Sequence, residues 1–156
     1  MDIKQQINIL YLIAREKAAA QMSINAICLS TIKSPAFDTE IRCATGNTSN
    51  TETYALRITE LNELIKDLDA LEESCKKDIE KYLNNIDDSI LREILRGKYI
   101  SKLTWKSIGS VGNTKDSARK LCNRFFAKHI EDEIISKANC RRFDELKDNL
   151  KELAAV

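Results

Sequence analysis

The side chains with the clearest chemical potential lie between residues 115 and 124, where charged and hydrogen-bonding groups follow one another closely. The polar members are Lys115, Asp116, Ser117, Arg119, Lys120, Asn123 and Arg124. In a helix they would oppose an apolar stripe made of Ala118, Leu121, Cys122 and Phe125. Arginine and lysine can donate to guanine, and asparagine matches the hydrogen-bonding edge of adenine. This arrangement predicts a helix face suited to the major groove of DNA.

Two further lysines, Lys102 and Lys106, precede this stretch and are predicted, with Lys115 and Arg124, to contact phosphates. Residues 88–130 carry 10 Lys and Arg against 3 Asp and Glu, a net charge of +7, whereas the whole chain has +1. Such a local basic segment is typical of nucleic-acid-binding modules. The alternative is a basic, solvent-exposed face of a helical bundle that has no such partner.

Catalytic and metal-binding chemistry has little support in the sequence. His129 is the single histidine, and the five cysteines are too scattered for a zinc site or a disulfide framework. Most of them are predicted to be small core residues. The chain has no glycine-rich phosphate loop and no nucleophile elbow. We therefore expect no enzyme, no cofactor and no metal.

Three short helices, at about 88–100, 104–111 and 114–129, are predicted to position the basic face. Thr104 and Thr114 suit N-caps, and Gly112-Asn113 suits the turn between the second and third helices. Two short helices joined by a tight turn form a helix-turn-helix unit. Trp105 is predicted to lie in its core, with a binding role as the alternative.

Long helices are predicted before this unit. Residues 3–31 form the first, with an apolar stripe of Ile3, Ile7, Leu10, Ala14, Ala18, Met22, Ile24 and Ile27. A loop at 33–51 follows, because it contains Ser34-Pro35 and a run of Gly, Asn, Thr and Ser. Residues 52–84 then carry a coiled-coil seam of Tyr54, Ile58, Leu61, Ile65, Leu68, Cys75, Ile79 and Tyr82. The two helices can form an antiparallel hairpin, or the seam can pair with a second chain in a homodimer.

After the basic unit, residues 131–154 are predicted to form an amphipathic helix, with Asn139 as the position of a kink or break. Its stripe consists of Ile134, Ala138, Phe143, Leu146, Leu150 and Leu153. The capping residues at 84–88 separate the hairpin from the basic unit. The expected organisation is a hairpin at 1–86, a helix-turn-helix domain at 87–130 and a C-terminal helix at 131–156.

Composition agrees with an all-α fold, because good helix formers dominate and proline occurs once. No apolar run approaches the ~20 residues that cross a bilayer, and the first residues do not resemble a signal peptide. We therefore expect a cytoplasmic protein without a membrane partner.

Residues 91–100 (LREILRGKYI) and 103–109 (LTWKSIG) resemble a motif, LR-x-IL-x-x-RYI followed by (S/T)W-x-x-IA, of phage late-transcription regulators of the RinA/ArpU type. Residues 34–42 and 58–61 resemble the loop and helix of the same family. The C-terminal part of that family is similar to the promoter-reading domain of sigma factors. The resemblance implies a bacterial host cell, activation of late packaging and morphogenesis genes, and double-stranded promoter DNA and host RNA polymerase as partners. It places the predicted 115–124 residues on the recognition helix.

Three functions follow from these patterns. The first is a sequence-specific DNA-binding transcriptional regulator. The second is a packaging-initiation protein similar to the small terminase, which also joins a helix-turn-helix to a coiled coil. The third is a helical adaptor that binds only protein.

Overall fold

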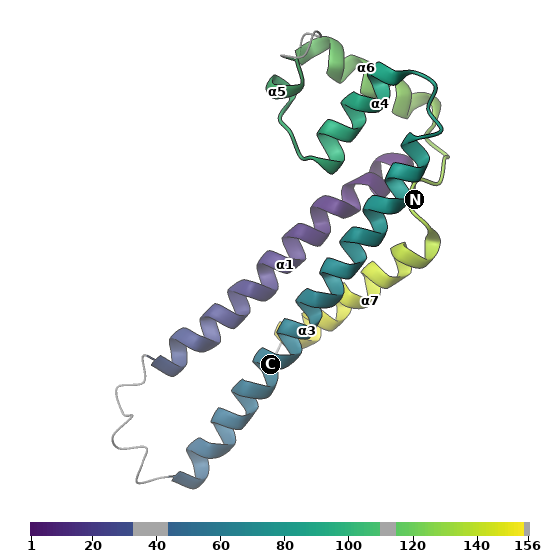
Figure 1. Cartoon of the computed structure of the whole chain (residues 1–156). Coiled ribbons are helices and arrows are strands. Elements are labelled where there is room, and N and C mark those ends of the chain that lie inside the picture. The colour runs from purple at the N-terminus through teal and green to yellow at the C-terminus, as the bar shows by residue number, and fades with distance from the viewer. Residues whose placement is uncertain (33–43, 110–114, 155–156) are drawn as a thin grey trace. The chain divides into compact units, whose positions relative to one another are not determined.

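The computed structural model describes residues 1–32, 44–109 and 115–154, and every regular element within these ranges is helical. The all-α prediction is therefore confirmed. In chain order the helices are α1 (Ile3–Ile32), α3 (Ala44–Leu83), α4 (Ser89–Leu95), η2 (Arg96–Ile100), α5 (Trp105–Gly109), α6 (Lys115–Lys128) and α7 (Lys137–Ala154) (Figure 1). A turn of π-helix, η2, directly continues α4. Across the described ranges, none of the helices has the length and apolar character needed to span a membrane.

The loop predicted at 33–51 is wrong in its second half. α3 begins at Ala44, so residues 44–51 are helical, while residues 33–43 lie outside the described residues. Gly, Asn, Thr and Ser have weak helix propensities, but extending an existing helix costs far less than nucleating one. The long helical stretch that follows therefore accounts for helical structure in these eight positions.

The helix predicted at 131–154 begins later, at Lys137. Ile134, which was predicted on its apolar stripe, is buried in the non-helical segment before it. That segment is held by side chains from elsewhere in the chain, because Gln6 Oε1 accepts hydrogen bonds from the backbone N–H groups of Ile134 and Ile135, at 2.8 and 3.0 Å. A backbone tied to another helix in this way cannot continue as α7.

The break considered at Asn139 does not occur, because α7 continues through this residue. Its side-chain amide donates to Ser74 Oγ at 3.0 Å and to Asp78 Oδ2 at 2.8 Å. Asp78 Oδ2 also accepts from the backbone N–H of Ser136, at 3.0 Å. Asn139 therefore fastens the start of α7 to α3 instead of interrupting the helix.

The chain groups into two compact units rather than three consecutive segments. Unit 1 contains Met1–Leu12 and Leu71–Arg142, and unit 2 contains Ile13–Ala70 and Phe143–Val156. α1, α3 and α7 each contribute to both units, because a long helix can pack against different partners at its two ends. Each unit is described separately below.

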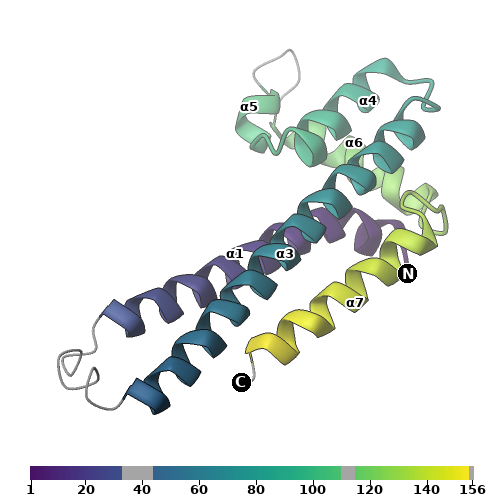
Figure 2. The same ribbon diagram turned by 60° about the horizontal axis from the view of Figure 1, so that its bottom comes forward.

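Unit 2 is made of the helical residues 13–32, 44–70 and 143–154. The first two segments run in opposite directions in both views (Figures 1 and 2). The ammonium of Lys17 in the first lies 2.9 Å from Asp69 Oδ1 in the second. The described core is apolar throughout and consists of Ile13, Ala20, Ile24, Ile27, Leu61, Leu64, Leu68, Phe143, Leu146 and Leu150.

The inner face of α1 agrees with its predicted position in part. Ala18 and Met22 were predicted to face inward, yet Ala18 is exposed and Met22 is 71% exposed. Five of the eight predicted residues are buried. The buried positions described in α1 are Ile3, Gln6, Ile7, Ile9, Leu10, Ile13, Ala20, Ile24 and Ile27. Gln6 is polar, so the apolar pattern alone did not include it.

Unit 1 contains the start of α1, the end of α3, the helices α4, η2, α5 and α6, and the start of α7. The backbone N–H of Ile3 donates to the carbonyl of Ile130 at 3.0 Å, and Gln6 Nε2 donates to the carbonyls of Met1 and Asp132. The cysteines fit the core prediction in part, since Cys75 and Cys122 are buried whereas Cys28 is exposed. Unit 1 contains every residue of the candidate site.

Candidate nucleic-acid interface

The four elements α4, η2, α5 and α6 form the basic module, a name used below for residues 88–109 and 115–128. α4 begins at a cap, because the Asp88 carboxylate accepts from the backbone N–H groups of Ile90 and Leu91 at 3.0 and 3.2 Å. This cap satisfies two donors that have no intrahelical acceptor. α4 then buries Leu91, Ile94 and Leu95.

α5 starts at Trp105 as the threonine cap predicts. Thr104 Oγ1 accepts a hydrogen bond from the backbone N–H of Ser107 at 3.2 Å. Ile108 is buried, so this short helix is anchored by one apolar side chain. The predicted turn at Gly112-Asn113 and the cap at Thr114 lie outside the described residues, as does Val111.

α6 separates its residues as the sequence predicts. Ala118, Cys122 and Phe125 are buried, while Leu121 is half-buried. Phe126, which the stripe did not include, is also buried and makes an edge-on ring contact with Tyr99 at 5.8 Å between centroids. The buried face of α6 is therefore wider than the predicted stripe.

The opposite face of α6 is exposed. Asp116, Ser117, Arg119, Lys120, Asn123 and Arg124 are all exposed, and Lys115 begins the helix. Asp116 lies in the first turn, where a negative charge is favourable beside the helix N-terminus. The predicted site residues of α6 for which exposure is described thus share one accessible face.

Cationic side chains of the basic module differ in whether a carboxylate of the protein is bound to them. Arg96 is bound by Glu80, with three guanidinium-to-carboxylate hydrogen bonds of 3.1 Å, and by Glu93. These hydrogen bonds raise the pKa of Arg96, Glu80 first. Lys106, Lys120, Arg124 and Lys128 are exposed and make no ion pair with any residue that the structure describes. These four side chains keep their charge available for an anion.

Lys102, for which a phosphate contact is predicted, is paired with a carboxylate in this structure, while its side chain is 49% exposed. Its ammonium lies 3.4 Å from Oε1 of Glu72, which is a buried residue. The ammonium of Lys76 lies 3.3 Å from the same oxygen. Lys102 also has a φ of 56°, a left-handed conformation that costs a lysine about 1 kcal/mol or more. From this backbone conformation the side chain of Lys102 pairs with a buried carboxylate on α3.

Trp105 differs from the predicted core residue, because its side chain is half-buried and two cations lie near its ring. Lys98 Nζ is 5.0 Å and Arg119 Cζ is 6.0 Å from the ring centroid. The contact joins η2, α5 and the exposed face of α6. Lys98 was not among the predicted site residues, although its position seven residues before the only tryptophan was visible in the sequence.

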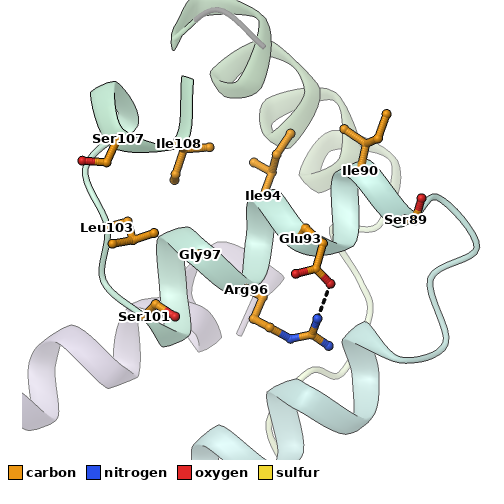
Figure 3. A pocket seen from close by; sticks show the side chains of 10 residues that line it. All are labelled: Ser89, Ile90, Glu93, Ile94, Arg96, Gly97, Ser101, Leu103, Ser107 and Ile108. Carbon is orange, nitrogen blue, oxygen red and sulfur yellow. Dashed lines mark hydrogen bonds and ion pairs between the residues drawn. The ribbon is translucent and has the colours of Figure 1, made fainter. Parts of the chain in front are cut away.

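A hollow of about 730 Å³ lies between α4, η2 and α5 (Figure 3). Its apolar lining includes Ile94, Leu103 and Ile108, and Gly97 leaves room along one wall. The polar residues that line it are Ser89, Glu93, Arg96, Ser101 and Ser107, and Figure 3 shows Glu93 bonded to Arg96. No described residues group three or more His, Cys, Asp or Glu side chains in a way that could hold a metal ion.

Comparisons of the chain with protein-family models, with curated proteins and with solved structures find no match. The resemblance to the RinA/ArpU-type regulators therefore stays a prediction from the motif at 91–109.

Proposed function

We propose that the protein is a sequence-specific DNA-binding transcriptional regulator and that α6 is its recognition helix. The observation that carries the proposal is the exposed face of α6, where Arg119, Lys120 and Asn123 lie on one side of a helix whose other side is buried. A helix of this kind fits the major groove and presents donors to guanine and an amide to adenine.

Phosphate contacts come from the cations with available charge. Lys106 on α5 and Arg124 on α6 flank the proposed reading face and are exposed. Lys115 is kept in this group because of its position at the start of α6. Lys102 is left out, because reaching a phosphate would strip Glu72 of one of its two lysine partners. The motif resemblance adds the biological setting: activation of phage late genes, with host RNA polymerase as a second partner.

The test begins with selection of bound sequences from a random pool of duplex DNA. Affinity is then measured for the selected duplex and for a scrambled duplex of the same composition. Asn123→Ala should cost about 1–3 kcal/mol on the selected duplex and much less on the scrambled one. Lys106→Ala should weaken both equally and reduce the slope of log K against log salt by about 0.9.

Lys66→Ala is the matched control, because this lysine is exposed on α3 and belongs to unit 2. It should change neither affinity nor slope. Failure to enrich any sequence, or equal losses for Asn123→Ala on both duplexes, would refute sequence-specific recognition by α6. A ring-sized oligomer in light scattering would instead favour the packaging-initiation protein.

A protein-binding adaptor is the second candidate, and the hollow between α4 and α5 favours it. Ile90 is 56% and Leu103 is 45% exposed at this hollow. Large exposed apolar side chains around a depression are typical of protein-binding surfaces. Absence of salt-dependent DNA binding by the intact chain would support this candidate.

A further inference from the structure

Two cationic side chains lie near the ring of Trp105, and this contact does not pair their charge with an anion. Lys98 lies 5.0 Å and Arg119 lies 6.0 Å from the ring centroid, and neither makes an ion pair with a described residue. An aromatic face attracts a cation through its quadrupole, also at exposed sites. The interaction restrains the side chain but leaves the charge and the N–H donors available.

Arg96 provides the contrast within the same module. Its guanidinium is occupied by Glu80 and Glu93, so its donors and its charge are already satisfied inside the protein. An arginine fixed in this way supports the fold and has little left to offer a phosphate or a base. Arg96 is therefore restrained by carboxylates, whereas Arg119 is restrained by an aromatic ring. Only the restraint by the ring leaves the guanidinium able to bind an anion or a base.

We infer that Trp105 is a positioning residue, which orients Arg119 beside the exposed face of α6 before DNA arrives. This inference rests on the proposed function, and it states how the conformation of Arg119, one of the proposed base-contacting side chains, is restrained before binding. A free arginine side chain loses rotamer entropy when it is immobilised. Restraint by the indole lowers that loss upon binding, so the benefit appears as tighter binding of the selected duplex.

The test is a double-mutant cycle on the duplex selected from the random pool. Trp105→Leu keeps apolar bulk but removes the aromatic face, and Arg119→Gln removes the cation. We expect Trp105→Leu to weaken binding about three- to ten-fold when Arg119 is present, and less than about two-fold in the Arg119→Gln background. Trp105→Phe retains a ring and should recover part of the loss.

A purely structural role for the tryptophan makes a different prediction. Loss of packing would weaken binding by the same factor with Arg119 present and in the Arg119→Gln background. The affinity of Trp105→Phe would then depend on the volume of its side chain and not on its aromatic character. Equal factors would overturn the inference while leaving the proposed function intact, because the wild type would still bind its selected duplex. Failure of the wild type to select any duplex would overturn both.

Helical content and thermal stability of each variant are measured alongside binding. If Trp105→Leu does not fold, the cycle is run with Trp105→Phe, whose smaller ring attracts the cation less strongly than indole. The expected result is then a smaller loss that again disappears in the Arg119→Gln background. A loss that persists there would count against the positioning role.

Discussion

Single polar side chains tie distant parts of unit 1 together, and Gln6 is the most completely used of them. Both of its amide protons and its carbonyl oxygen are engaged, with Met1, Asp132, Ile134 and Ile135 as partners. Gln6 is only 5% exposed, so water cannot replace these bonds if the side chain is removed. Buried backbone groups that lose their partner pay the full desolvation cost.

Gln6→Ala is therefore expected to lower the free energy of unfolding by about 2–4 kcal/mol. Gln21→Ala is the matched control, because Gln21 is exposed on the same helix and bonds only to Asn25 among the contacts described. It should change stability by less than about 0.5 kcal/mol. Urea unfolding followed by circular dichroism measures both, and equal effects would contradict the structural role of Gln6.

Asp132 makes unit 1 sensitive to acid. Its carboxylate accepts from the Tyr82 hydroxyl at 2.6 Å and lies 2.9 Å from His129 Nδ1. The bond from Tyr82 first, and then His129, hold the pKa of Asp132 below its ordinary value of 3.8. A lowered pKa in the folded state stabilises the protein above the unfolded pKa, and this contribution disappears as the pH falls through the folded pKa.

Asp132→Asn should accordingly be less stable than the wild type at neutral pH, with a difference that shrinks once the pH drops below about 3.8. Asp148→Asn serves as the control, since Asp148 is exposed on α7 and its nearest cation is 3.9 Å away. Urea midpoints across a pH series provide the measurement. A stability difference that stays constant through the acidic range would show that the Asp132 charge does not contribute.

At the scale of elements, local signals placed most of the helices and failed where distant groups intervene. The caps at Asp88 and Thr104 and the exposed face of α6 follow from residue type and from 3.6-residue periodicity. The start of α7 does not, because Gln6 and Asp78 reach the preceding segment from helices far away in the sequence. Periodicity carries no information about such long-range bonds.

Similar reasoning explains what was missed at the candidate site. Exposure on α6 could be predicted because it depends only on the helix's own apolar stripe. The pairing of Lys102 with Glu72 could not, because it joins residues 30 positions apart through a left-handed backbone. The position of Trp105 between Lys98 and Arg119 likewise requires three elements to be packed first.

The cap of α4 can be tested as an element of the basic module. Asp88→Ala removes the acceptor for two backbone N–H groups and should cost about 1 kcal/mol of stability. Asp87→Ala changes the neighbouring charge without touching the cap, because Asp87 is exposed and accepts none of these bonds. Thermal unfolding of both variants distinguishes capping from net charge, and equal shifts would argue against the cap.

For the molecule as a whole, the reactivity of buried cysteine thiols can be used to measure the unfolding of unit 1. Burial raises the pKa of Cys75 to about 12 and that of Cys122 to about 11, so both are poor nucleophiles in the folded state. Cys28 is exposed on α1. At about pH 8 a thiol reagent should therefore modify Cys28 first and reach Cys75 and Cys122 only upon unfolding.

Because both buried thiols belong to unit 1, their labelling should rise at the same urea concentration. Mass spectrometry of peptides from samples labelled for a fixed time gives the midpoint for each cysteine. Labelling of Cys122 at a clearly lower concentration than Cys75 would mean that the basic module opens separately from the α3 residues in the same unit.

The bonds between the start of α1 and residues 130–135 also set the order in which the chain can fold during synthesis. Ile3 and Gln6 are made before their partners, which lie more than 120 positions later, as the Gln6 to Ile134 separation of 128 shows. Ribosomes add about 5–20 residues per second, so these groups wait several seconds for their acceptors and donors. The bonds between the start of α1 and residues 130–135 therefore form only after α4 to α6 have been made. A nascent chain stopped before residue 130 should contain helices but lack the cooperative unfolding of the finished protein.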